Sequence, residues 1–250
     1  MKKRIIARLD IKKNRLIKGV HLEGLRHIGD PCVHAQRYYQ EGIDELLLLD
    51  TVATLHGRNA LSSIIDKITK SIFIPITVGG GINSVEQAQL MFNSGADKIT
   101  LNSFACENPN LITEISQIFG CQAITLSLQI KRNLNSFQVM THNGRENSNR
   151  NLPDWIHEAQ DAGIGEIMLT SIDKDGTMNG FDLGLLEFVI SLSEVPIICS
   201  GGILTSKDVR DCFELGAQAV AIGSGFHYQK IDIKSLKNQL FNSNADIRFS

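Results

Sequence analysis

The sequence PITVGGGINSVEQAQLMFNSGADKITLNSFA, residues 75–105, returns in altered form 121 positions later as PIICSGGILTSKDVRDCFELGAQAVAIGSGF, residues 196–226. Each copy reads as an apolar strand, a glycine turn, an amphipathic helix and a second apolar strand that ends in a small polar turn. The same shift lays GIDELLLLD, residues 42–50, over GIGEIMLTS, residues 163–171. The chain therefore consists of two similar halves.

Eight short runs rich in Ile, Val and Leu alternate with longer amphipathic segments along the 250 residues. Runs that are apolar on both faces and separated by helices indicate a parallel sheet. We therefore predict an α/β fold, a (β/α)8 TIM barrel of two half-barrels forming a single domain over residues 1–250, with a doubly wound open sheet as the alternative. The runs are residues 4–10, 45–50, 74–81, 97–103, 122–129, 166–173, 195–202 and 219–225.

Composition argues against several classes of protein. The 25 basic and 27 acidic residues are well mixed, so we expect no nucleic-acid partner, and no window approaches 18 uninterrupted apolar residues, so we expect no membrane partner. The chain begins MKKRIIARLD, which meets an Asp before a signal peptide could form, and its five cysteines are scattered. The seven histidines lack metal-ligand spacing. We expect a cytoplasmic protein without metal or cofactor.

Glycine turns stand at matching places in the two halves, at the carboxyl ends of predicted strands, where barrel chemistry gathers. One such turn alone usually marks only a change of direction. Its recurrence favours one phosphate site per half, because glycine lets backbone N–H groups approach an anion. The turns are Gly79–Gly81 with Asn102 and Ser103 in the first half, and Gly201–Gly202, Gly223–Ser224 and Asp175–Thr177 in the second.

A shift of 119 positions lays LDIKKN, residues 9–14, over LQIKRN, residues 128–133. The two stretches are the first and fifth predicted strands, which face each other across a barrel of eight. Asp10 and Gln129 are therefore equivalent positions on opposite sides of the mouth.

Several motifs together resemble the HisF family, the cyclase subunits of imidazole glycerol phosphate synthase, from Arg4 to Arg248. The motifs are RLDIKKNRLIKG, GIDELLLLD, TVGGGI, GADKITLN, EIMLTSIDKDGTMNGFD, SGGI and FHY. The isomerase of the same pathway shares the barrel, but LTSIDKDGT and Lys18-Gly19 resemble the cyclase more closely. The resemblance implies a barrel that takes ammonia from a glutaminase partner and uses it to cleave and cyclise a ribotide with two phosphates.

The same resemblance implies roles for individual residues. Asp10 matches a catalytic acid/base, Lys18 a substrate-binding lysine, and Asp50 and Asp175 polar groups at the mouth. Phosphate contacts map to Gly81, Asn102 and Ser103 in the first half and to Gly176, Gly202, Gly223 and Ser224 in the second. A charged ammonia gate maps to the opposite end of the barrel, where the glutaminase would bind as a heterodimer; its residues are Arg4, Glu45, Lys98 and Glu166.

Two departures from the family pattern touch the cyclase chemistry. Gln129 stands where the family has its second catalytic Asp, and an amide cannot exchange a proton near neutral pH. Arg8 replaces the usual Cys and is expected to pair with Asp10, lowering the pKa of that carboxyl. The loop after the fifth strand, MTHNGRENSN, also drifts from the family apart from Asn143-Gly144.

Three hypotheses follow from this pattern. The favoured one is a divergent paralogue that keeps the ammonia conduit and supplies amidation of a bacterial surface-polysaccharide sugar, converting an acylamino group to an acetamidino one. The second is a working cyclase of histidine biosynthesis that tolerates Gln129. The third is a non-catalytic scaffold for the glutaminase.

Overall fold

The computed structural model describes residues 2–52, 61–134, 136–243 and 245–248. Its strands are β1 (Arg4–Lys12), β2 (Arg15–Val20), β3 (Glu23–Gly29), β4 (Glu45–Asp50), β5 (Ile76–Gly79), β6 (Lys98–Leu101), β7 (Ile124–Asn133), β8 (Ser136–Thr141), β9 (Glu146–Asn147), β10 (Glu166–Ser171), β11 (Ile197–Ser200) and β12 (Ala219–Ile222). Its helices are α1 (Pro31–Gln40), α3 (Ser62–Ile68), α4 (Val85–Asn93), α5 (Ser103–Glu107), α6 (Asn110–Phe119), the 3-10 helix η1 (Cys121–Ala123), α7 (Leu152–Ala162), α8 (Leu183–Ile190), α9 (Ser206–Leu215), α10 (Ser224–His227) and α11 (Ile233–Asn242).

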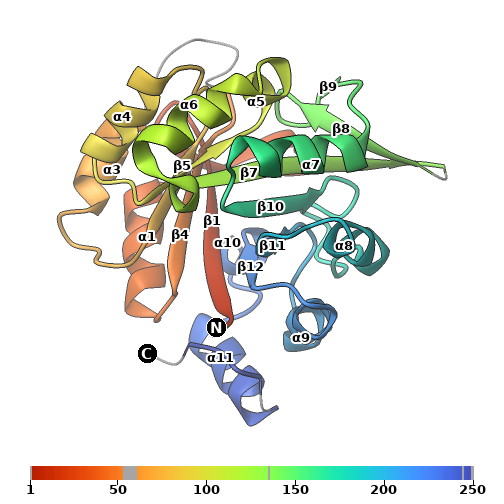
Figure 1. Ribbon diagram of the computed structural model, residues 1–250. Helices are drawn as coiled ribbons and strands as arrows, with labels where there is room; N and C mark the ends of the chain where they lie inside the picture. Colours follow the sequence, from red (N-terminus) through yellow and green to blue (C-terminus); the bar gives the residue numbers. More distant parts are fainter. Residues whose placement is uncertain (1, 53–60, 135, 244, 249–250) are drawn as a thin grey trace.

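Eight parallel strands close into a barrel in the order β1, β4, β5, β6, β7, β10, β11, β12, with β12 pairing back to β1 (Figure 1). The predicted TIM barrel is therefore confirmed, and the open doubly wound sheet is wrong because β7 and β10 pair in register. β1 and β7 are four strands apart in this order. They therefore stand on opposite sides of the barrel, as the repeat predicts.

The repeat is visible in the local structure of both halves. Ser84 caps α4 by accepting from Gln87 N, and Thr205, at the equivalent position, caps α9 by accepting from Asp208 N. Gly80 and Gly201 are likewise equivalent and have φ of 109° and 113°. A Cβ at either place would lie within 2.6 Å of a backbone oxygen of the preceding strand, so each turn requires glycine.

Alternation along each strand divides the side chains between two regions. Outward-facing residues pack under the helices in the main core, whereas a smaller apolar group fills part of the barrel interior. This interior group is Ile6, Leu47, Leu49, Met168, Ile198, Ala219 and Ala221. Within the described residues, no helix is long and apolar enough to cross a bilayer.

Two hairpins decorate the barrel and were not predicted. Lys13 and Asn14 both have positive φ and turn β1 back into β2, as a two-residue hairpin loop requires. The pairing of Asp10 with Ile17 then brings Lys18 back to the barrel mouth. In the second hairpin, the end of the long β7 projects from the barrel and pairs with β8, which in turn pairs with β9 (Figure 1).

Candidate active site

Four charged side chains meet inside the barrel mouth, and all four are buried. The cations are Arg8 on β1 and Lys18 on β2; the carboxylates are Asp10 on β1 and Asp175 after β10. Arg8 Nε donates to Asp10 Oδ1 at 2.9 Å, and Lys18 Nζ donates to Asp10 Oδ2 at 3.0 Å and to Asp175 Oδ1 at 2.8 Å. Arg8 Nη1 also donates to Ser200 Oγ at 3.0 Å and to Asp175 Oδ2 at 3.5 Å. Two positive and two negative groups thus neutralise one another.

This arrangement fixes Asp10 in its ionised form. Burial on its own would raise the pKa of Asp10, but the charges of Arg8 and Lys18 outweigh it and hold that pKa well below its usual value. Burial opposes the charged forms of Arg8 and Lys18 as well, yet the two carboxylates raise the pKa of both. Removing one member of a buried pair leaves an uncompensated charge and typically costs about 3–5 kcal/mol. In this state, Asp10 is an ion-pair partner and a weak proton acceptor.

Gln129 lies on β7, opposite β1, and is buried like Asp10. Its side-chain oxygen accepts no hydrogen bond from the described residues. The amide can receive a hydrogen bond from a small donor, but it cannot give or take a proton near neutral pH. At these two opposite positions, the mouth therefore carries a carboxylate held by cations, Asp10, and a neutral acceptor, Gln129.

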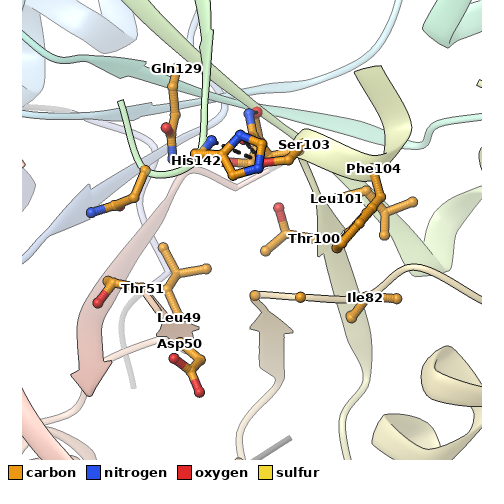
Figure 2. A pocket seen from close by; sticks show the side chains of 15 residues that line it. Leu49, Asp50, Thr51, Ile82, Thr100, Leu101, Ser103, Phe104, Gln129 and His142 are labelled. Atoms are coloured by element: carbon orange, nitrogen blue, oxygen red, sulfur yellow. Dashed lines mark hydrogen bonds between the residues drawn. The ribbon is translucent and has the colours of Figure 1, made fainter. Parts of the chain in front are cut away.

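The first-half pocket is the cavity at the ends of β4, β5, β6 and β7, and Gln129 lines it (Figure 2). Ser103 and His142 lie side by side in the view, where His142 N donates to Ser103 Oγ at 2.9 Å. Asn102 Nδ2 donates to Ser127 O at 2.8 Å, which fixes the amide. The predicted residues that line this pocket are Asp50, Gly81, Asn102, Ser103 and Gln129.

The second-half pocket lies at the ends of β10, β11 and β12, and its lining includes Arg8 and Lys18. The cations therefore stand beside the second glycine cluster and not the first. The predicted residues that line it are Lys18, Asp175, Gly176, Gly202, Gly223 and Ser224. Asp10 is not among the described residues that line either pocket, because it lies within the ion cluster.

Four charges encircle the amino-terminal end of the barrel. Arg4 Nη1 donates to Glu45 at 2.8 Å, Arg4 Nη2 bonds Glu166, and Lys98 Nζ donates to Glu166 at 3.0 Å. The ion pairs thus run in the order Glu45, Arg4, Glu166, Lys98. Lys98 is the most exposed of the four side chains, at 23%.

Between this ring and the mouth, one wall of the interior carries hydroxyls. Thr100, Thr125 and Thr170 stand on the neighbouring strands β6, β7 and β10, and each is buried. None of the three hydroxyls has a hydrogen-bond partner within the described part of the chain. Buried polar groups usually have partners, so this wall can receive a small polar molecule. Sequence reasoning missed these residues. Thr100 is two positions from Lys98, Thr125 is four from Gln129 and Thr170 is four from Glu166, and these even spacings would have indicated inward side chains.

Comparison with known proteins agrees with this architecture. Residues 4–232 match a family described as "Histidine biosynthesis protein". "Imidazole glycerol phosphate synthase subunit HisF" of Legionella pneumophila is 51% identical over 201 residues, which are 80% of this chain and 95% of that protein. Proteins of the same name from Helicobacter hepaticus and Thermotoga sp. strain RQ2 are 44% and 42% identical, covering 98% of this chain and 98% and 97% of theirs.

These matches define the class as the histidine biosynthesis barrels. Within that class, the chain belongs to the HisF family.

Proposed function

We propose that the chain is the barrel subunit of a glutamine amidotransferase complex, that it receives ammonia from a glutaminase, and that it delivers this ammonia to the amidation of a surface-polysaccharide sugar. The observation that carries the proposal is the state of the two catalytic positions. Asp10 is tied to Arg8 and Lys18, and Gln129 has no proton to exchange.

The absence of one acid or base would slow the cyclase reaction considerably. One positioned acid or base supplies typically 10²–10⁴-fold in rate, which corresponds to roughly 3–5 kcal/mol of barrier lowering. The proposed route of ammonia through the barrel passes the polar groups of the interior. These are the charged ring, the hydroxyl wall and the Gln129 oxygen.

The glutaminase is proposed to bind over the charged ring as a heterodimer. The relatives support such an arrangement because their name describes each as a subunit of a synthase. Lys98 is the ring member that a partner reaches most easily, since its side chain is the most exposed. The glycine turns of the two pockets are proposed to bind the phosphates of a substrate.

A working cyclase is the second candidate, and the names of the relatives favour it. The decisive experiment mixes the protein with its glutaminase, glutamine and the two-phosphate ribotide. We expect glutamine hydrolysis without imidazole glycerol phosphate. Formation of that product at rates typical of an enzyme would refute the paralogue and establish the cyclase.

The scaffold hypothesis needs a separate readout. If the barrel only holds the glutaminase, ammonia will escape to solvent and the downstream amidation will not depend on the ring charges. Nitrogen-15 from the glutamine amide, traced into the sugar in competition with unlabelled ammonium, distinguishes delivery through the barrel from delivery through solvent.

A further inference from the structure

Three aromatic side chains, Tyr38 and His34 from α1 and His227 from α10, connect these two helices beside the second-half pocket. Tyr38 Oη lies 2.6 Å from His227 Nδ1 and 3.2 Å from His34 Nδ1. The Tyr38 and His227 rings stack with their centroids 6.0 Å apart, and both side chains are buried, whereas His34 is half-buried. One ring nitrogen of His227 is therefore held by the tyrosine.

The other ring nitrogen of His227 lies close to Gly223, a residue that lines the second-half pocket. His227 Nε2 is buried and has no partner within the described residues, and the same is true of Ser224 Oγ. A Cβ placed on Gly223 would lie 3.6 Å from Lys18 Cε and 3.7 Å from His227 Nε2, so these groups bound one small space. Gly223, Ser224 and Lys18 all line the second-half pocket. Two unpartnered buried groups around one glycine indicate a missing ligand.

The contacts among His34, Tyr38 and His227 determine which ring nitrogen of His227 carries the proton. Burial and the charge of Lys18 lower the pKa of His227 to about 3, so the ring is neutral near neutral pH and carries one N–H. Burial also raises the pKa of Tyr38, which therefore keeps its hydroxyl proton. When Tyr38 donates to Nδ1, the proton of His227 must be on Nε2, and His34 Nδ1–H completes the chain by donating to Tyr38. An anion in the pocket favours this direction because it accepts from Nε2–H.

We infer that His227 is an anion-binding residue of the second-half pocket, donating from Nε2–H to a phosphate oxygen at Gly223–Ser224, and that Tyr38 is its positioning residue. The inference deepens the proposed function and rests on the phosphate site proposed there. It adds a side-chain donor to a site otherwise built from glycine turns and Lys18.

The two halves differ at this position, which supplies an internal control. The shift of 121 residues that relates the halves lays Cys106 over His227. Cys106 is buried, and burial raises the pKa of its thiol to about 12. A neutral thiol is a weak donor, so at the position equivalent to His227 the first half has no histidine N–H.

Titration of the full chain with inorganic phosphate, followed by amide NMR, tests the inference. The amides of Gly81 and Ser103 report the first-half pocket, and those of Gly202 and Gly223 report the second. A hydrogen bond to a charged group corresponds to about a 10- to 100-fold change in Kd. We expect the Kd for phosphate to rise by this factor in His227→Leu, in the second-half pocket alone. Tyr38→Phe should raise it less. His227→Gln should bind phosphate nearly as well as the wild type, because its amide can replace Nε2–H. Tyr228→Phe, next to His227 but exposed, is the matched control.

Long-range proton–nitrogen NMR of the wild-type imidazole provides a reading that does not depend on any variant. A proton found on Nδ1 in the phosphate-saturated protein would overturn the inference, as would unchanged second-half binding in His227→Leu. Absence of phosphate binding in both halves of the wild type would instead refute the proposed phosphate sites, and this inference with them. Phosphate binding that weakens only in the second-half pocket of His227→Leu would support both the phosphate sites and the role of His227.

Discussion

Arg8 and Asp10 stand two residues apart on β1, so their side chains leave the same face of the strand, and Arg8 Nε meets Asp10 Oδ1 at 2.9 Å in the barrel mouth. The guanidinium that binds Asp10 also reaches Ser200 on β11. The position of the expected acid/base is thus part of a buried ion cluster, and the chemistry of the mouth depends on whether that cluster opens.

Replacing Arg8 by Cys should release Asp10. We expect the pKa of Asp10 to rise, because Lys18 is then the one cation of the described residues still bonded to it. Carbon-13 NMR of the Asp10 carboxyl measures the change directly. Arg8→Lys is the control, since it keeps the charge and should leave the pKa low; an equal rise in both variants would contradict the assignment to charge.

A carboxylate at position 129 tests whether the proposed absence of cyclisation comes from the chemistry or from substrate binding. In an Arg8→Cys background, Gln129→Asp is expected to raise cyclisation of the two-phosphate ribotide with ammonium by about 10²–10⁴-fold over the parent. Gln129→Asn controls for the shorter side chain without adding an acid. A silent double variant that still binds the ribotide would place the defect outside these two positions.

Glu166 bridges Arg4 and Lys98 at the amino-terminal ring, so Glu166→Gln should weaken both ion pairs and impair the passage of ammonia proposed for the ring. We expect glutamine hydrolysis by the bound glutaminase to persist, while transfer of the labelled nitrogen falls several-fold. Asp211→Asn, which breaks an exposed pair with Lys207 on α9, serves as control. Undiminished transfer in Glu166→Gln would favour the scaffold.

His227 should make stability fall as the pH is lowered. Its pKa is about 3 in the folded protein and 6.5 in the reference state, so between these values the unfolded chain binds a proton that the folded chain does not. The stabilisation is present above pH 6.5 and declines toward pH 3 by up to about 1.4 kcal/mol per pH unit. Urea unfolding at several pH values should give His227→Gln a shallower slope than wild type; parallel slopes would show that His227 is protonated when folded.

The sequence predicted those features that follow from periodicity and duplication. The eight strands, the opposition of Asp10 and Gln129, and the two glycine clusters all come from residues close together in the chain or related by the repeat. The pairing of Arg8 with Asp10 is also local, because alternation on a strand puts them on one face.

Contacts between distant positions could not be predicted in the same way. Ser200 accepts from Arg8 across 192 positions, and Tyr38 meets His227 across 189, because barrel closure brings their elements together. Lys18 returns to Asp10 through a hairpin whose loop, Lys13-Asn14, lacks the usual glycine. Such contacts depend on strand register, which periodicity alone does not determine.

The guanidinium of Arg8 also makes its position costly to change. It fills the space between β1, β11 and the loop after β10, and it satisfies Ser200 and both carboxylates. A single mutation to a small residue leaves a polar hole that water must fill and a net negative charge shared by one lysine. The packing of this one side chain therefore couples the charge balance of the mouth to its hydration.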